Sequence, residues 1–320
     1  MSYALDDATN DVVEFDPEGV LFAASTGGHF QQSILVARQL GNLESSRWIT
    51  FDHPQTRSMR SEVSMAVVPY IGSRDYAGLL RASRGVVREI RQSSASTVVS
   101  TGAAIALIAL PVAVLLRRRA VYIESVSRVE GPSTTGRILR YFPGISMYCQ
   151  HPRWAGGAWK LWPSVLAAYK RVSRPGSGAT PRTIFVTVGT LKQYRFDRLL
   201  RSLAELGGSF EFVWQVGCTD GLDLPGTVHT SMASAEFDDA VRTSDVVITH
   251  AGVGSILRIL ELGRYPIVCP RESSRGEHID DHQFQICRLV SETGVGLVVD
   301  ADQVSSKDID QAAGYGVEAA

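Results

Sequence analysis

The chain has 320 residues, 44% of them hydrophobic and 20% charged, a composition that excludes a disordered chain and is typical of a soluble globular protein with room for two domains. The formal net charge of −1 conceals an asymmetry, because residues 19–150 carry 15 basic and 7 acidic side chains, and residues 183–320 carry 11 and 20. The basic half favours an anionic partner, such as a phosphorylated lipid or a membrane surface. The alternative is an asymmetric surface without a partner.

Residues 1–18 form an acidic segment that lacks the basic and apolar regions of a signal peptide, so we expect a disordered tail there. The chain contains four cysteines, and none of them is spaced as C-x-x-C. This pattern indicates reduced thiols in a cytosolic protein.

Residues 19–150 alternate short apolar runs with helical segments. Helices are expected from the turn at Gly28 to about Leu40 and over Tyr76–Gln92. The alternation predicts an α/β domain with a parallel sheet and helices on both faces. The expected strands are Val20–Ala24, Arg47–Phe51, Met65–Pro69, Thr97–Ser100, Ala120–Ile123 and Ile145–Cys149.

The stretch from Ala103 to Leu116 is apolar throughout and raises the question of a membrane segment. It has 14 residues and contains Pro111, whereas a spanning helix needs roughly 20 apolar residues. We therefore favour a buried helix between two parallel strands. The alternative is a helix at the bilayer interface, with Arg117–Arg119 meeting lipid phosphates.

Residues 151–182 differ in composition from their surroundings, with three tryptophans, six basic residues and no acidic ones. We interpret this segment as an interdomain linker whose tryptophans cover the hinge. The strand–helix alternation resumes at Thr183 and runs to about Val299, and one short helix is expected after it. Residues 183–320 are therefore predicted to form a second α/β domain.

Two units of strand, glycine turn and helix in this second domain predict a diphosphate site. The first is IFVTVGT, ending at Thr190, and in the second the strand that ends at His250 leads into AGVGS and an apolar helix. Backbone N–H groups of such turns and helix N-termini bind phosphate oxygens. The residues expected to do so are Gly189, Thr190, Gly252, Gly254 and Ser255.

The C-terminal motifs HAGVGS, PR…GEH and DDHQ, taken in this order, resemble the donor half of the GT-B glycosyltransferases. They are similar in particular to the catalytic subunit of the two-part transferase that adds the second N-acetylglucosamine to a lipid-linked sugar, and to its bacterial exopolysaccharide relatives. In the N-terminal half, AASTGGHFQQSILVARQL and YIES…TTGRILRYF resemble the membrane-associated, acceptor-binding subunit of the same enzyme. The resemblance implies a fusion of both subunits in a GT-B fold, with two Rossmann-like parallel-sheet domains facing across a cleft.

The resemblance places the donor against the second domain. His250 is expected to face the nucleotide or the diphosphate, and Asp281, His282 and Gln283 follow the next strand, where their polar atoms suit sugar hydroxyls. The alternative for this Asp-His-Gln cluster is helix capping by Asp281. No spaced DxD pair stands out in the cleft segments, so we expect neither a metal nor another cofactor, with a UDP-sugar as the co-substrate.

An inverting sugar transfer needs a base for the acceptor hydroxyl. His29, which follows Gly27 and Gly28 at a strand-to-helix turn, is the first candidate, since an imidazole titrates near neutral pH. Its alternative is a structural or capping histidine. Glu124, at a strand end within YIES, is the second candidate, with an N-cap as its alternative. Gly27, Gly28 and Arg128 are expected to contact the acceptor or its phosphate.

Two positions depart from the family pattern. Many related enzymes carry a glutamate that holds the ribose hydroxyls where this chain has Arg258, and Glu261, about one helical turn on, is expected to take that role. Related enzymes often carry a glutamate three residues after the GGH histidine, where this chain has Gln32. Either departure predicts an altered choice of donor or weakened activity.

We therefore predict an inverting, metal-independent glycosyltransferase that moves a sugar from a UDP-sugar to a lipid-diphosphate-linked saccharide. The expected setting is exopolysaccharide or capsule synthesis, peripheral on the inner face of the cell membrane. The alternatives are a non-hydrolysing UDP-sugar 2-epimerase and a catalytically inactive nucleotide-sugar-binding scaffold. No nucleic-acid partner is expected, because no recognisable binding module accompanies the arginines.

Overall fold

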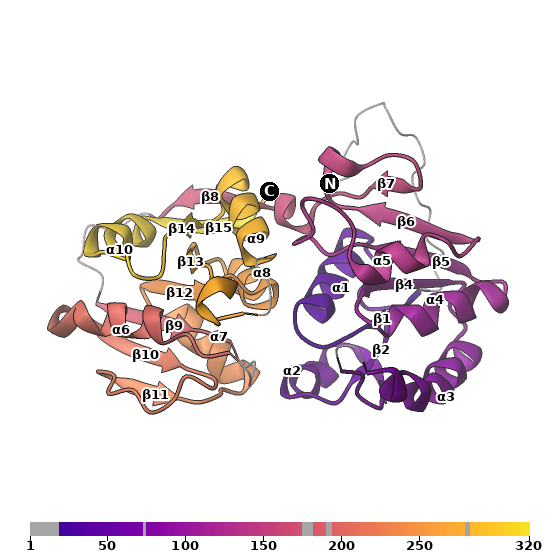
Figure 1. The fold of residues 1–320 in the computed structure, drawn as a ribbon, viewed down its shortest axis with the longest axis horizontal. Coiled ribbons are helices and arrows are strands. Elements are labelled where there is room, and N and C mark those ends of the chain that lie inside the picture. The colour runs from indigo at the N-terminus through magenta and orange to yellow at the C-terminus, as the bar shows by residue number, and fades with distance from the viewer. Residues whose placement is uncertain (1–18, 73–74, 175–181, 190–193, 279–281) are drawn as a thin grey trace.

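The computed structural model describes residues 19–72, 75–174, 182–189, 194–278 and 282–320, so the predicted tail lies outside the described residues. Figure 1 shows two α/β domains side by side, each built around its own sheet. Every strand pair within these two sheets is parallel. The predicted fold class, two Rossmann-like parallel-sheet domains, is confirmed.

The N-terminal domain has a seven-stranded sheet in the order β3-β2-β1-β4-β5-β6-β7. Its central strands β1 and β4 are buried along their whole length, as expected for parallel strands with helices on both faces. Side chains of α1 pack on one face, and those of α3 and α4 on the other. The elements are β1 (Val20–Ala24), α1 (Gly28–Gln39), β2 (Arg47–Phe51), α2 (Pro54–Ser58), η1 (Met59–Ser61), β3 (Ser64–Val68), α3 (Tyr76–Gln92), β4 (Thr97–Gly102), α4 (Ala106–Leu115), β5 (Arg119–Ile123), α5 (Thr134–Leu139), β6 (Ile145–Cys149), η2 (Pro152–Trp154), β7 (Trp159–Leu161) and η3 (Val165–Ala168).

The C-terminal domain has a six-stranded sheet in the order β11-β10-β9-β12-β13-β14. A separate antiparallel pair joins β8 (Tyr169–Ser173) to β15 (Tyr315–Ala319). The remaining elements are β9 (Thr183–Thr187), α6 (Asp197–Glu205), η4 (Gly207–Ser209), β10 (Glu211–Gln215), β11 (Thr227–His229), α7 (Ser234–Thr243), β12 (Val246–His250), α8 (Val253–Glu261), β13 (Pro266–Cys269), η5 (Ser273–Arg275), α9 (His282–Thr293), β14 (Leu297–Val298) and α10 (Ser306–Ala313).

In both sheets the order of the strands reverses beside the first strand of the domain. The reversal lies between β1 and β4 in the first sheet and between β9 and β12 in the second. Ligands of open α/β sheets bind outside the carboxyl ends of the strands at this point, because the flanking connections leave to opposite faces there. The predicted glycine turns follow β1, β9 and β12, so the topology places all three at such points.

The apolar stretch after β4 forms α4, which packs against α3, β4 and β5. Five of its ten residues are buried and four more are partly buried, as expected for a helix that packs between two parallel strands. Leu115 at its C-terminal end is exposed. No helix in the described ranges is both long and apolar enough to cross a membrane.

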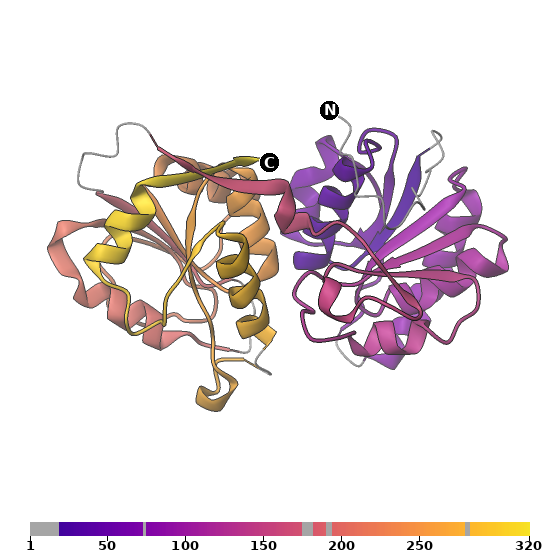
Figure 2. The same ribbon diagram turned by 90° about the horizontal axis from the view of Figure 1, so that it is seen from above.

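The predicted linker, residues 151–182, contains regular structure. β7 extends the first sheet by pairing with β6, and β8 pairs with the C-terminal strand β15. The tryptophans pack on the N-terminal domain, since Trp159 contacts the ring of Tyr122 edge-on and Trp162 that of Tyr148. Figure 2 shows β8 running from the N-terminal domain across the C-terminal one.

Candidate active site between the two domains

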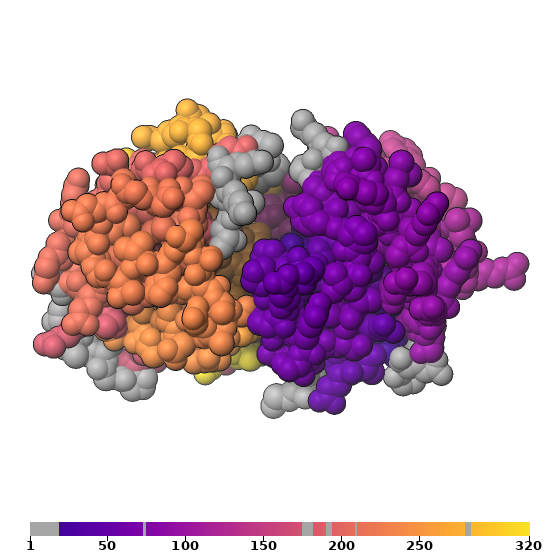
Figure 3. All heavy atoms as spheres, turned by 90° about the horizontal axis from the view of Figure 1, so that it is seen from below, coloured from indigo at the N-terminus to yellow at the C-terminus, as the bar shows by residue number. Residues whose placement is uncertain are grey.

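The glycine turns of the two domains meet at the domain interface. A methyl group on Gly28 would lie 3.2 Å from Cβ of Val253 and 3.3 Å from the backbone N of Gly254. Glycine at these positions therefore lets the turn after β1 approach the N-terminus of α8. The structure thus brings the predicted acceptor turn next to the predicted diphosphate turn. Figure 3 shows the surface hollowed between the two domains.

His29 lies in the first turn of α1. Its Nδ1 is 2.7 Å from the carbonyl oxygen of Thr101, at the end of β4. Because a carbonyl only accepts hydrogen bonds, Nδ1 carries the proton and Nε2 keeps its lone pair. Burial lowers the pKa of His29, against the opposing effect of the bond to Thr101, and so favours the neutral ring. The arrangement resembles that of an oriented general base.

Thr101 and Gly102 belong to the site, although the sequence analysis did not single them out. The Thr101 hydroxyl donates to the carbonyl of His29 at 2.7 Å, so the two residues are tied twice. Gly102 has φ +119°, and a methyl group there would lie 2.8 Å from Cε1 of His29. The signal available in the sequence was the Thr-Gly pair that ends a strand beside the switch point.

Glu124 is fully buried directly after β5, and its carboxylate accepts four hydrogen bonds. The donors are the hydroxyl of Tyr122 and the backbone N of Ser125, both at 3.0 Å, and the backbone N and hydroxyl of Ser133, both at 2.9 Å. These bonds hold the segment from Ser125 to Ser133 against the end of β5. They favour a positioning role over that of a base, and the catalytic role of Glu124 stays a prediction.

Gln32 is 1% exposed and connects α1 to the same segment. Its side-chain oxygen accepts from the backbone N of Val126 at 2.8 Å, and its amide donates to the Ser125 hydroxyl at 3.1 Å. An amide can do both, whereas a carboxylate can only accept. Arg128 follows this turn, half-buried, and its charge contributes to lowering the pKa of His29. The segment therefore places Arg128 on the same side of the domain as His29.

His250 ends β12 and is 8% exposed. Its ring fits between two glycines, because a methyl group would lie 2.7 Å from its Cε1 on Gly189 and 2.2 Å from its Nε2 on Gly252. Burial, reinforced by the charge of Arg271, lowers the pKa of His250 to about 3. The imidazole is therefore neutral at physiological pH and contributes dipoles to the site rather than a charge.

This shift predicts a loss of stability in acid. The unfolded chain takes up a proton on this residue near pH 6.5, while the folded chain resists until about pH 3. As the pH drops through this window, the free energy of unfolding therefore decreases, by roughly 1.4 kcal/mol per pH unit from this residue. Urea unfolding of the protein and of a His250→Asn variant between pH 7 and pH 5 measures it. The variant should show the shallower slope, and equal slopes would contradict the buried neutral ring.

Glu261, the residue expected at the ribose, lies in α8 with its carboxylate turned to the N-terminal domain. Gln31 and Arg38 of α1 both bond to it, and Arg258 lies 3.2 Å away. Arg258 in turn pairs with Asp238 of α7. In this arrangement Glu261 joins the two domains, so the ribose role stays a prediction that requires these contacts to open.

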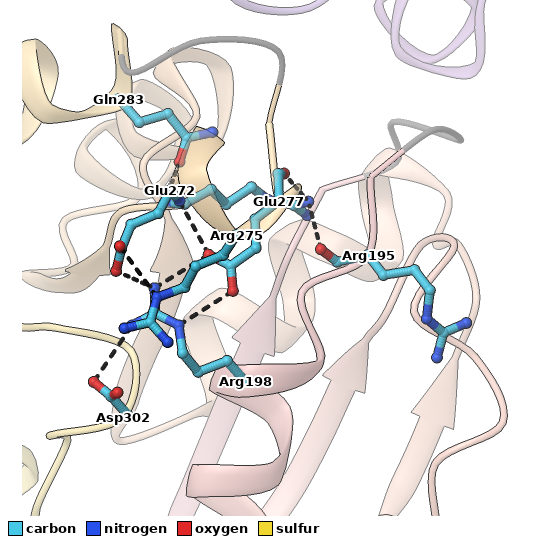
Figure 4. Close-up of polar contacts among 8 residues, drawn as sticks. Arg195, Arg198, Glu272, Arg275, Glu277, Gln283 and Asp302 are labelled. Atoms are coloured by element: carbon cyan, nitrogen blue, oxygen red, sulfur yellow. Dashed lines mark hydrogen bonds and ion pairs between the residues drawn. The ribbon is translucent and has the colours of Figure 1, made fainter.

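The loop after β13 is braced by charged side chains, as Figure 4 shows. Arg198 of α6 lies 2.9 Å from Glu272 and 3.1 Å from Glu277. The side-chain oxygen of Gln283, at the start of α9, accepts from the backbone N of Arg271 at 2.9 Å. Gln283 is thus placed at the carboxyl end of β13, where its role as a sugar ligand stays a prediction.

Some predicted donor residues cannot be placed. Thr190 and Asp281 lie outside the described residues, and His282 begins α9 but its side chain is not described. Ser255 and Gly254 lie in the first turn of α8, whose leading N–H groups have no acceptor within the helix. In the described ranges, no group of three or more His, Cys, Asp or Glu side chains could hold a metal ion.

Residues 183–313 match the glycosyltransferase family 28 C-terminal domain. The match covers β9 to α10, including the glycine turns after β9 and β12, and it confirms the predicted enzyme class, a glycosyltransferase. No curated protein matches the chain.

Solved structures of the same fold cover both domains. MurG from Acinetobacter baumannii is 17% identical, with a TM-score of 0.54 over 91% of this chain and 88% of that one. The glycosyltransferase SnogD from Streptomyces nogalater is 18% identical, with a TM-score of 0.58 over 93% and 91%. The glycosyltransferase SsfS6 from Streptomyces sp. SF2575, complexed with thymidine diphosphate, is 16% identical, with a TM-score of 0.54 over 92% and 94%. These similarities confirm the GT-B fold.

Proposed function

We propose that the protein is an inverting glycosyltransferase that moves a sugar from a UDP-sugar to a saccharide linked through a diphosphate to a lipid. The observation that carries the proposal is the meeting of the turn at Gly27–His29 with the N-terminus of α8. It sets a candidate base of one domain beside a phosphate-binding helix terminus of the other.

Two findings support a nucleotide donor on the C-terminal domain. This domain matches family 28, and SsfS6, a structure of the same fold, was solved with thymidine diphosphate. The leading N–H groups of α8 suit a diphosphate, and they offer it a transition-state stabilisation that needs no metal. We propose UDP as the nucleotide on the resemblance of the HAGVGS and DDHQ motifs.

The proposed transfer step follows from the neutral tautomer of His29, which carries its proton on Nδ1. Its Nε2 takes the proton of the acceptor hydroxyl while that oxygen attacks the anomeric carbon from the face opposite the diphosphate. The bond between the anomeric carbon and the diphosphate oxygen breaks, and UDP leaves with the electron pair. Attack from the opposite face inverts the anomeric configuration. Thr101 keeps the imidazole in the required tautomer throughout.

A patch of exposed apolar side chains supports a peripheral membrane location, and with it the proposed lipid-linked acceptor. α4 and α5 lie together, and exposed apolar side chains gather there: Leu115 is 80% exposed and Tyr141 74%. Arg137 and Arg140 flank them, and the guanidinium of Arg140 lies over the Tyr141 ring. Apolar side chains flanked by arginines suit an anionic bilayer surface. We place the enzyme on the inner face of the cell membrane, in exopolysaccharide or capsule assembly.

The test is transfer from a panel of radiolabelled UDP-sugars to short-chain lipid-diphosphate saccharides, with the anomeric configuration of the product determined by NMR. We expect one UDP-sugar to label the lipid fraction with an inverted linkage. Conversion of a UDP-sugar to its C2 epimer without an acceptor would favour the epimerase instead. Nucleotide binding without turnover under any acceptor would favour the scaffold.

A further inference from the structure

Arg271, which follows β13 and Pro270, carries a buried positive charge. It is 3% exposed, and within the described part of the chain it forms no ion pair with a carboxylate. Its guanidinium donates instead to the carbonyl oxygens of Val188 and Tyr194, both at 2.6 Å, and of Glu277 at 3.1 Å. Its Nε has no partner among the described residues. A buried charge without a counter-charge is costly, so its retention calls for a physical reason.

Glu277, an acidic residue next to Arg271, already has other partners for its carboxylate. The Glu277 carboxylate lies 3.1 Å from Arg198 and accepts from the backbone N of Glu272 at 3.0 Å. Arg198 also pairs with Glu272 and with Asp302 (Figure 4). The two arginines thus differ, because Arg198 is neutralised by carboxylates, whereas Arg271 is held by carbonyl dipoles and by the face of the Phe196 ring, 4.9 Å from its guanidinium carbon.

The guanidinium lies beside the candidate diphosphate turn. β9, β12 and β13 are neighbours in the sheet, and the side chain of Arg271 reaches from β13 to the residue that precedes Gly189. It also bonds to Tyr194, so it joins the two described ends of the chain on either side of residues 190–193. The ring of His250, which packs on Gly189, lies close enough for the charge of Arg271 to act on it.

We propose that Arg271 is a positioning residue for the donor, which fixes the turn at Gly189 and supplies the buried positive charge that the donor's diphosphate compensates. This inference rests on the proposed function, and it names a charge-selective element that the motifs did not indicate. A paired carboxylate would neutralise the guanidinium. Carbonyl oxygens position it but carry no net charge, so its positive charge can still attract an anionic ligand. The effect should therefore grow with the charge of the ligand.

The experiment measures the affinities of the full-length protein for uridine, UMP and UDP by calorimetry, in the wild type and in Arg271→Gln, Arg271→Lys and Arg198→Gln. Arg271→Gln should weaken UDP at least about tenfold more than uridine, with UMP between them. Arg271→Lys keeps the charge and should hold the UDP-to-uridine ratio within about threefold of the wild type. Arg198→Gln is the matched control, since it loosens the same loop and removes a charge that is already paired.

The outcomes separate the two proposals. If the wild type binds none of the three ligands, the proposed function fails. If the wild type binds UDP but Arg271→Gln weakens all three ligands equally, or Arg198→Gln changes the ratio as much, the role of Arg271 is overturned and the proposed function stands. If Arg271→Gln does not fold, Arg271→Lys decides alone, because a tenfold fall in its UDP-to-uridine ratio would contradict a role for charge.

Discussion

A His29→Asn variant should lose about 10²- to 10⁴-fold in kcat for sugar transfer, while its affinity for the nucleotide changes little. Asparagine can still donate to the carbonyl of Thr101, which His29 contacts at 2.7 Å, so the turn should keep its shape. It cannot take a proton from the acceptor. The loss should therefore fall on the chemical step, and steady-state kinetics with a saturating donor measures it.

The pH profile gives an independent readout for the same residue. Burial lowers the pKa of His29 below the ordinary 6.5, so the ring is unprotonated at pH 7 and the rate should fall only as the pH drops through this lowered value. The acid limb of kcat/KM should lie below pH 6.5 and disappear in the variant. A His229→Asn variant, changed on the edge strand β11, is the control and should keep both rate and profile. An unchanged kcat in His29→Asn would assign the base elsewhere.

The fold could be predicted well from local pattern, for a physical reason. Strands such as Val20–Ala24 and Ile145–Cys149 are short apolar runs bounded by turn residues, and the structure has them with the predicted ends. β7 has three residues at a sheet edge, too few to show a periodic pattern in the sequence. The pairing of β8 with β15 joins segments far apart in the sequence, and no local pattern encodes such a partner.

The candidate site likewise has features that local sequence pattern predicts and features that it does not. Gly28, Gly252 and His29 follow strand ends, and local turn chemistry placed them at the domain interface. The partners of Glu261 lie on α1 in the other domain, more than 200 positions away, so periodicity along α8 could suggest a ribose contact but not the contact between domains. The burial of Arg271 could not be predicted either, because its acceptors are backbone carbonyls, which every residue type has.

A Glu124→Gln variant should unfold with about 2–4 kcal/mol less free energy than the wild type. The carboxylate oxygens accept from four donors, and an amide replaces one acceptor with a donor aimed at other donors. At least one buried N–H or O–H group is then left without an acceptor. Urea unfolding at pH 7 measures the loss. Tyr122→Phe is the matched control, since it removes a single donor and should cost only about 1 kcal/mol.

The same variant separates the two candidate bases. If Glu124 holds the segment up to Ser133 in place, Glu124→Gln should lower activity together with stability and leave the acid limb of the pH profile where His29 sets it. If Glu124 is itself the base, the amide should abolish transfer even where the variant is fully folded, and the acid limb should vanish. The saturated carboxylate favours the first result, because a base that already accepts four hydrogen bonds must give one up before it can take a proton.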